Sequence, residues 1–371
     1  MQKVLIASSN LELGQEIAQF FSSEVNVQQA KNGEEAIDLY LDLNPDLIFL
    51  ENNLVQPDSM EVIDYIRNTC NDQNVYIILL SIKSQTNFSL IKAGANDVLW
   101  LPLNKEELQI KLRIAKRQLT LVHNLNQAYR RIKKEIDLLS ELQLKLLPKC
   151  NLDLENVKIQ SYYKPSGQAS GDYYDYLFVD KNKLRVCIAD VSGHGAKASF
   201  IMSIVRTIFH FTKFNSFSLD AAVEMLNNYL VELLGSDVDF VTFFAAELNL
   251  KDKEMQYVNA GHCPIVVKKD GKVQHLKSEY PILGFFPLQI RSNKITYARK
   301  LDLLLYTDGF YEWDLEPGRQ FGLENFLHLV DAYFARQEDL YLEELVSELN
   351  QVTEMPPMFR DDVTGLLLSC R

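Results

Sequence analysis

The chain has 371 residues, of which 47% are hydrophobic and 24% are charged, and its formal net charge at pH 7 is -12. These proportions are typical of a globular protein with two or three domains and exclude an intrinsically disordered chain. The acidic balance argues against a nucleic-acid partner, because binding to phosphates requires an excess of Lys and Arg.

The chain begins with MQKVLIASSN, which leads directly into an apolar run and lacks the organisation of a signal peptide. No uninterrupted apolar stretch approaches the roughly 20 residues that a membrane helix requires. The five cysteines are scattered without a CxxC pair, a pattern typical of reduced thiols. We therefore expect a cytoplasmic protein that makes no membrane contact.

Residues 1–103 alternate short apolar runs with amphipathic stretches. The runs VLIA, DLIFL, VYIILL and DVLWL have the composition of buried parallel strands. Helical spacing of apolar residues occupies segments between them, at 11–21, 33–43 and 60–68. This alternation predicts a doubly wound α/β domain whose functional groups follow the carboxyl ends of the strands.

These first 103 residues resemble the receiver domain of response regulators through the segments KNGEEAIDLY, NPDLIFLE and AGANDVLWLP. The residues that carry receiver chemistry differ, however. Ser8 and Ser9 stand where a receiver has an acidic pair for magnesium, and Glu51 stands at the phosphoacceptor position. Ser81 matches the hydroxyl position, whereas Leu101 replaces the receiver lysine.

Phosphoryl transfer to an aspartate requires a magnesium ion and a cation that neutralises the developing charge. We therefore predict a pseudo-receiver that is not phosphorylated in the usual way. Two interpretations of Glu51 remain open. It either mimics a phosphorylated state near Ser81, or it is a relic in a domain kept for binding; we favour the second, because a carboxylate carries less charge than an acyl phosphate.

Residues 104–149 form a predicted linker, in which 105–147 have the pattern of one long helix. Apolar residues recur at spacings of four and three, with one extra three-residue step between Val122 and Leu125 that would locally overwind a coiled coil. Pro148 ends the pattern. The exposed apolar seam predicts a homodimer through residues 105–147; the alternative is that the seam packs within its own chain.

Residues 150–371 lose the alternation and show many short strands with helical segments at about 198–211 and 219–234. This pattern predicts an α+β domain built as a mainly antiparallel β-sandwich flanked by helices.

Four aspartates in this segment lie at predicted strand ends beside turn-forming residues. They are Asp172 in SGDYYD, Asp190 in IADVSGHG, Asp308 in LYTDG and Asp361 in FRDDVT. Buried carboxylates are costly unless a cation or hydrogen bonds compensate them. If the four strand ends converge, their oxygen atoms favour hard divalent ions such as magnesium or manganese. Any one of these aspartates alone is more typical of a turn or a cap.

Residues from about 140 to 371 resemble the PPM family of metal-dependent protein phosphatases (protein phosphatase 2C-like), in its bacterial SpoIIE group. The resemblance is carried by LQLKLLP, SGDYYD, ADVSGHG, FVTFF, NAGHCP, LYTDGFYE, FGLE and DDVT. It implies two divalent cations, Mn²⁺ or Mg²⁺. Asp190 would bridge them, Asp308 and Asp361 would complete one shell, and Asp172 with the Val191 carbonyl would hold the other.

Other residues near these motifs have less defined roles. His194 is a candidate general acid, although a turn histidine is an equal alternative. We expect structural roles for His262 and for Asp362, which would support the loop without binding metal. Asp175 has no assigned task, and we expect it to be exposed to solvent.

Together, these observations predict a metal-dependent phosphoserine/phosphothreonine protein phosphatase regulated by the pseudo-receiver. By family analogy alone, its substrate would be a small phosphorylated regulator such as an anti-sigma factor antagonist. The rival hypothesis is a catalytically silent adaptor that binds partner proteins through both domains. A transcription regulator is disfavoured, because the sequence has no helix-turn-helix or basic output segment.

Overall fold

The computed structural model describes residues 2–83, 88–148, 151–165, 169–193, 195–214, 217–235, 239–316, 319–352 and 361–371. The chain divides into two compact units, Met1–Ile132 and Lys133–Arg371. Helix α5 (Lys105–Leu146) begins in the first unit and ends in the second. Within the described ranges, no helix combines the length and apolar character that crossing a membrane would require.

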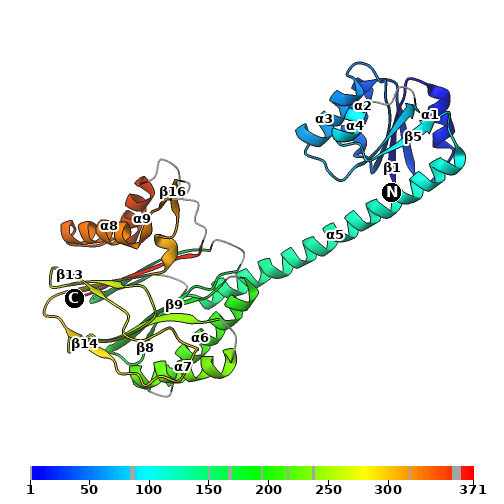
Figure 1. The fold of residues 1–371 in the computed structure, drawn as a ribbon. Helices are drawn as coiled ribbons and strands as arrows, with labels where there is room; N and C mark the ends of the chain where they lie inside the picture. Colours follow the sequence, from blue (N-terminus) through cyan, green and yellow to red (C-terminus); the bar gives the residue numbers. More distant parts are fainter. Residues whose placement is uncertain are drawn as a thin grey trace. The chain divides into compact units, whose positions relative to one another are not determined.

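The first unit is a parallel five-stranded sheet in the order β2-β1-β3-β4-β5, with helices on both faces (Figure 1). Its strands are β1 (Lys3–Ala7), β2 (Asn26–Ala30), β3 (Leu47–Glu51), β4 (Tyr76–Ile82) and β5 (Asp97–Leu101). Its helices before α5 are α1 (Leu11–Ala18), α2 (Gly33–Leu43), α3 (Ser59–Asp64), the π-helix Tyr65–Thr69 and α4 (Phe88–Lys92).

Alternating strand residues face opposite sides of this sheet, as the period of two requires. Leu5 packs beneath α2 and α3, whereas its neighbour Ile6 packs beneath α1 and α5. Side-chain caps fix where the helices begin. Asn32 accepts a hydrogen bond from the Glu35 backbone at the start of α2, and Asp58 with Glu61 forms a capping box on α3.

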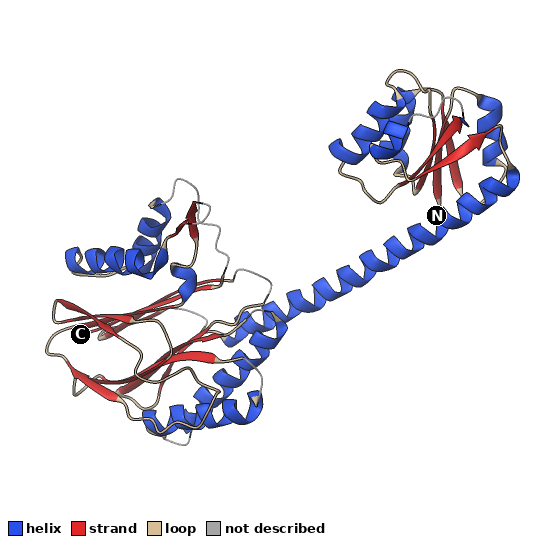
Figure 2. Ribbon diagram, viewed as in Figure 1, coloured by secondary structure: helices blue, strands red, loops and turns tan. Residues whose placement is uncertain are grey.

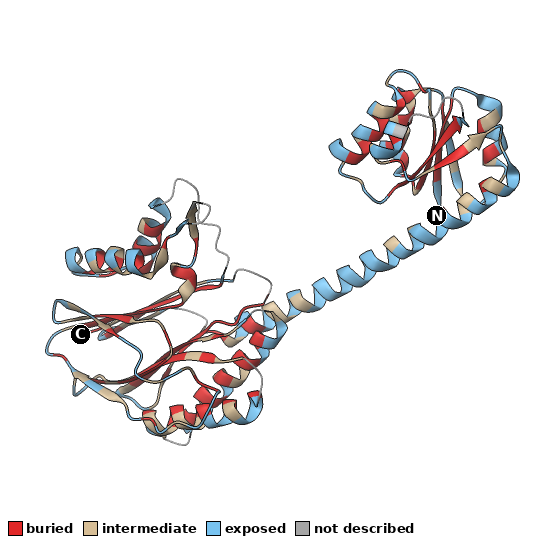
Figure 3. Ribbon diagram, viewed as in Figure 1, coloured by how far each residue is buried: buried red, intermediate tan, exposed pale blue. Residues whose placement is uncertain are grey.

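The apolar seam of α5 divides into two parts. Leu108 and Ala115 are fully buried against the sheet of the first unit. Leu125, Tyr129 and Ile132 are 69%, 66% and 57% exposed, and Figure 3 shows this stretch of the helix as exposed. The beginning of the seam therefore packs within its own chain, which was the alternative to dimerisation. The later part, at Leu125, Tyr129 and Ile132, is exposed to solvent.

The second unit contains two antiparallel sheets and a short hairpin (Figure 2). The first sheet has the order β14-β11-β10-β9-β8, and the second has the order β13-β12-β15-β18-β7-β6. The first contains β8 (Tyr173–Phe178), β9 (Lys183–Val191), β10 (Val241–Asn249), β11 (Glu254–Ala260) and β14 (Asn293–Thr296). The second contains β6 (Leu152–Leu154), β7 (Val157–Lys164), β12 (Ile265–Lys269), β13 (Lys272–Leu276), β15 (Leu301–Tyr306) and β18 (Val363–Cys370). The hairpin pairs β16 (Asp314–Glu316) with β17 (Arg319–Gln320).

Helices cover the outer faces of both sheets. Helices α6 (Ala196–Phe214) and α7 (Leu219–Leu234) pack on the first sheet, and α8 (Gly322–Arg336) and α9 (Leu342–Gln351) pack on the second. A short 3₁₀ helix (Asp308–Phe310) follows β15. The structure confirms the predicted fold class: a receiver-like parallel sheet, a long helix, and a β-sandwich flanked by helices.

A candidate metal centre at converging strand ends

The four predicted aspartates lie at the ends of four strands. Two of these strands, β8 and β9, are neighbours in the first sheet, and the other two, β15 and β18, are neighbours in the second. Asp172 precedes β8, and Asp190 is the penultimate residue of β9. Tyr173 pairs with Ala189, which places Asp172 opposite Asp190 at the next position of the first sheet. Asp308 follows β15, and Asp361 lies two residues before β18, which is the neighbour of β15 in the second sheet.

Thr307 connects the two sheets at this edge. Its hydroxyl donates to a carboxylate oxygen of Asp172 at 2.8 Å, and its backbone N–H donates to the Thr364 carbonyl at 3.0 Å. Asp362 makes a second connection, because one of its carboxylate oxygens accepts from the Gly171 N–H at 3.1 Å. The loops that carry Asp172, Asp308 and Asp361 therefore meet at one place.

Two glycines permit this close approach. A Cβ at Gly171 would lie 2.6 Å from the Val191 carbonyl oxygen, the backbone atom predicted to bind metal. A Cβ at Gly309 would lie 2.0 Å from the Asp362 carbonyl oxygen. Any side chain at either position would force the loops apart, so the convergence of the strand ends depends on these residues.

The carboxyl groups raise one another's pKa. Burial, followed by the charge of Asp190, raises the pKa of Asp172 well above its usual value. Burial and then the charges of Asp308 and Asp361 raise the pKa of Asp190 to about 8. Burial and then Asp361 and Glu312 raise the pKa of Asp308 to about 7. The cluster therefore favours protonation or a compensating cation.

The donor set fits hard divalent cations, although the carboxylates do not stand in ligating positions. Within the described residues, no Lys or Arg forms an ion pair with any of the four aspartates. Within the same residues, no three His, Cys, Asp or Glu side chains are grouped tightly enough to hold an ion. Four carboxylates and a backbone carbonyl are the oxygen donors that magnesium and manganese prefer.

Glu312 was not singled out from the sequence, yet its charge acts on this cluster. It lies four residues after Asp308, and its backbone N–H donates to the Asp308 carbonyl at 2.8 Å. Its negative charge contributes to the raised pKa of both Asp190 and Asp308. The segment LYTDGFYE contained this signal, but spacing alone gave the glutamate no role.

Gln143 connects the end of α5 to the loop that carries Asp172. Its side chain is 4% exposed, donates to the Ser170 carbonyl and accepts from the Ser170 N–H at 3.0 Å. The Ser199 hydroxyl on α6 also donates to the Ser170 carbonyl, at 3.2 Å. The last turns of α5 and the start of α6 therefore hold the backbone two residues before Asp172.

The expectation that Asp175 is exposed is wrong. It is 4% exposed, and one carboxylate oxygen accepts from the Tyr173 hydroxyl at 2.6 Å and lies 2.7 Å from the His210 Nε2 atom. His210 lies on α6, 35 residues further along the chain, so no local pattern could reveal it. Asp175 thus connects β8 to α6.

Of the two histidines considered from the sequence, His194 and His262, the structure describes only His262. His194, the candidate general acid, lies outside the described residues. His262 is 4% exposed; its Nδ1 atom lies 2.8 Å from the Thr242 hydroxyl, and its Nε2 atom lies 2.9 Å from the Tyr306 carbonyl oxygen. Burial lowers the pKa of His262 to about 4. A neutral imidazole between β10 and β15 agrees with the structural role expected for it.

In the first unit, serine side chains bind the Glu51 carboxylate. One oxygen of Glu51 accepts from the Ser8 hydroxyl at 3.1 Å, the Ser9 N–H at 2.7 Å and the Ser9 hydroxyl at 2.9 Å. The Ser81 hydroxyl donates to the Ile82 carbonyl at 3.4 Å. The residues that replace the acidic pair of a receiver therefore serve as hydrogen-bond donors to Glu51.

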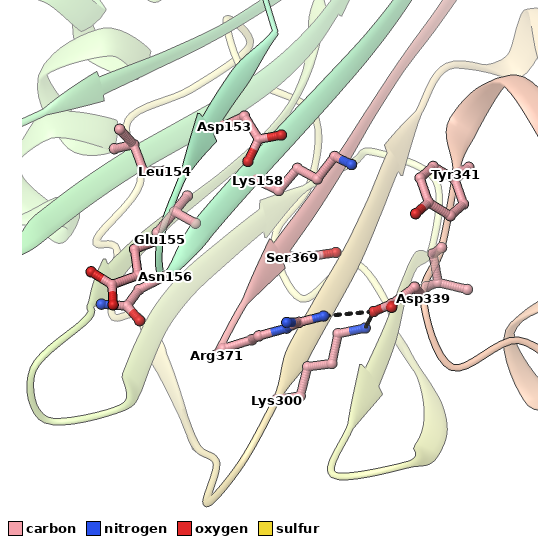
Figure 4. A pocket seen from close by; sticks show the side chains of 12 residues that line it. Asp153, Leu154, Glu155, Asn156, Lys158, Lys300, Asp339, Tyr341, Ser369 and Arg371 are labelled. Atoms are coloured by element: carbon pink, nitrogen blue, oxygen red, sulfur yellow. Dashed lines mark hydrogen bonds and ion pairs between the residues drawn. The ribbon is translucent and has the colours of Figure 1, made fainter.

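A cavity of about 220 Å³ lies at the opposite ends of β15 and β18 (Figure 4). Lys300 and Arg371 point toward Asp339 in it, at 3.2 and 2.8 Å. The length of β15, about 3.3 Å per residue, separates this cavity from Asp308. Two of its cationic groups are paired within the cavity, and it is separate from the carboxylate cluster.

Comparison with known proteins gives two family matches. The family described as Stage II sporulation protein E (SpoIIE) matches residues 180–371, just over half of the chain. The response regulator receiver domain matches residues 4–113. The first match contains Asp190, Asp308 and Asp361, whereas Asp172 precedes it.

Curated relatives match about half of the chain. The phosphoserine phosphatase RsbP of Bacillus subtilis strain 168 is 31% identical over 182 residues, which are 48% of this chain and 45% of that protein. The phosphoserine phosphatase RsbU of the same strain is 27% identical over 190 residues, 50% of this chain and 56% of that protein. The chain thus spans about half the length of these relatives.

A solved structure shares the fold. The SiaA-PP2C domain of Pseudomonas aeruginosa superimposes with a TM-score of 0.54 and 21% identity, covering 66% of this chain and 98% of that domain. This likeness establishes the fold of the second unit and nothing about its activity.

Proposed function

Because the chain belongs to the SpoIIE family, we propose that it is a metal-dependent phosphatase that removes phosphate from phosphoserine or phosphothreonine in proteins. The observation that carries the proposal is the convergence of four carboxylates from two sheets, none of which forms an ion pair with a Lys or Arg in the described residues. The names of RsbP and RsbU, both phosphoserine phosphatases, support the same class of reaction.

We propose the following ligands for two divalent cations, Mn²⁺ or Mg²⁺. Asp190 would bridge both ions, Asp308 and Asp361 would complete one shell, and Asp172 with the Val191 carbonyl would hold the other. Bound there, such ions supply an activated water and neutralise charge on the phosphoryl group. The hydrogen bond from Thr307 orients the Asp172 carboxylate, and the absence of a side chain at Gly171 keeps a Cβ away from the Val191 carbonyl oxygen.

We further propose a separate role for each of three segments of the chain. Residues 1–103 would act as a pseudo-receiver, 104–149 as a helical linker and 150–371 as the phosphatase. The exposure of Leu125, Tyr129 and Ile132 supports a homodimer through the later part of residues 105–147. The contact between Gln143 and Ser170 supports communication between the linker and the Asp172 loop. The substrate would be a small signalling regulator such as an anti-sigma factor antagonist.

The test is hydrolysis of p-nitrophenyl phosphate by the full chain with manganese, with EDTA, and with the variants Asp308→Asn and Asp153→Asn. Asp153 is an exposed aspartate of the same unit and serves as the matched control. Activity that requires manganese, is lost in Asp308→Asn and persists in Asp153→Asn is expected. Calorimetric manganese binding without hydrolysis of this ester or of a phosphoserine peptide would instead favour the adaptor hypothesis.

A further inference from the structure

Two phenylalanine rings contact each other beside the candidate metal centre, and a third phenylalanine follows one of them in the chain. Phe285 and Phe286 are consecutive and are 47% and 51% exposed. The ring of Phe285 lies 6.3 Å, centroid to centroid, from the half-buried ring of Phe240. We call Phe240, Phe285 and Phe286 the aromatic platform. Contiguous exposed apolar surface commonly marks an interaction site.

Strand pairing fixes the position of the platform relative to the carboxylates. Thr242 pairs with Asp190 across β10 and β9, and Phe240 precedes Thr242 by two residues, or about 7 Å along the chain. The Phe240 carbonyl accepts from the Ser192 N–H at 2.9 Å, and the Ser192 hydroxyl accepts from the Phe240 N–H at 2.8 Å. The platform therefore begins beside the backbone that carries Asp190.

The loop that presents Phe285 and Phe286 is held by buried groups. The fully buried Asn227 side chain on α7 donates to the Phe286 carbonyl at 2.9 Å and accepts from the Gly284 N–H at 3.0 Å. Leu283 and Val241 exchange two backbone hydrogen bonds, at 3.1 and 2.9 Å. These hydrogen bonds hold the backbone before and after Phe285. The exposure of the two rings therefore follows from the backbone position that the fold imposes.

We propose that the aromatic platform receives apolar side chains that flank the phosphorylated residue of a protein substrate. This inference rests on the proposed phosphatase function. A phosphoryl group that reaches Asp190 must bring the neighbouring substrate residues over the adjoining surface, where Phe240 begins. About half of the surface of Phe285 and of Phe286 is exposed, and together the two side chains offer only about 200 Å² of apolar surface. A stable interface between two copies buries about 800 Å² on each partner, so this area suits a transient substrate better than a permanent dimer.

The experiment compares two phosphoserine peptides that differ only beside the phosphoserine, where one carries two leucines and the other two serines. The readout is the ratio of their kcat/KM values with manganese, measured within each enzyme. We expect a ratio of about tenfold for the unmodified chain and near unity for the Phe285→Ser/Phe286→Ser variant. Phe214→Ser removes an 80% exposed ring elsewhere in the second unit and should keep the original ratio.

The outcomes separate the platform from the phosphatase. Equal hydrolysis of both peptides by the unmodified chain, or a ratio that survives in the double variant, overturns the platform and leaves the phosphatase intact. Absence of metal-dependent hydrolysis of both peptides and of p-nitrophenyl phosphate overturns both proposals. A change in sedimentation of the double variant would assign the surface to self-association and overturn the substrate role. The single variant Phe286→Ser repeats the ratio measurement with a smaller perturbation of the loop.

Discussion

Replacing Asp190 by asparagine should stabilise the second unit in the absence of metal while abolishing hydrolysis. The pKa of Asp190 is raised from 3.8 to about 8, chiefly by burial and then by Asp308 and Asp361. Such a group takes up a proton on folding between these two pH values. The free energy of unfolding therefore falls as the pH rises through this window, because the folded state binds more protons than the unfolded state.

The magnitude follows from the same shift. A rise from 3.8 to about 8 corresponds to at most about 6 kcal/mol of unfolding free energy. Asp190 keeps partial access to solvent, which screens its charge, so we expect about 2 kcal/mol. Asparagine cannot ionise and preserves the shape of the side chain. At pH 8 in EDTA, the variant should unfold about 4–8 °C above the unmodified chain; at pH 4 the difference should disappear.

Tryptophan fluorescence can isolate the transition of the second unit. The chain has two tryptophans: Trp100 belongs to the first unit, and Trp313, 2% exposed, belongs to the second. Thermal unfolding is therefore followed in a Trp100→Phe background, with Asp153→Asn as the control. Manganese should stabilise the unmodified chain more than Asp190→Asn. Lower stability of Asp190→Asn at pH 8 in EDTA would refute the reasoning, because it would show that the Asp190 carboxylate is not destabilised by its surroundings.

Three further predictions concern the first unit and α5. Gln143→Ala removes the acceptor of the buried Ser170 N–H and leaves the Ser170 carbonyl with the Ser199 hydroxyl, so we expect a loss of about 1–3 kcal/mol of unfolding free energy and weaker manganese activation, measured by melting and by titrating activity with metal. Ser9→Ala removes one of the hydrogen bonds to Glu51 and should lower the melting temperature of the first unit by a few degrees, with or without magnesium; a magnesium-dependent melting temperature would contradict the metal-free interpretation of this site. Leu125→Asp should shift a dimer toward monomer in analytical ultracentrifugation, and an unchanged mass would remove the case for pairing through α5.

Helices and strands could be predicted from the sequence wherever apolar residues recurred at a regular spacing. The buried strand containing Phe49 and the helix from Lys105 follow directly from runs and spacings that survive in the structure. The helix predicted over 60–68 is less regular, because α3 ends at Asp64 and a π-helical turn continues to Thr69. Arg67 in that turn donates to the Gly94 carbonyl, 27 residues away, and to the Asp72 and Val75 carbonyls, and local periodicity cannot reveal these partners.

The candidate centre was predictable as a set of aspartates, but its supporting contacts were not. The motifs identified Asp172 and Asp308, whereas the hydrogen bond from Thr307 that links their loops joins positions 135 residues apart. The pairing of Asp175 with His210 likewise depends on where α6 packs. Turn residues indicate a strand end, but the sheet order decides which strand ends meet.

The two units compensate a carboxylate at a strand end in different ways. In the first, Glu51 accepts hydrogen bonds from Ser8 and Ser9, so neutral donors occupy one oxygen of its carboxylate. In the second, Asp190 faces other carboxylates, and its raised pKa shows that the neighbouring groups oppose ionisation. A divalent cation would therefore displace satisfied hydrogen bonds in the first unit, but it would relieve repulsion in the second. We propose that this difference separates the two sites: the first would take no part in phosphoacceptor chemistry, whereas the second would hold two metal ions. On this proposal, a signal would reach the first unit through binding to its surface and not through transfer of a phosphoryl group to Glu51.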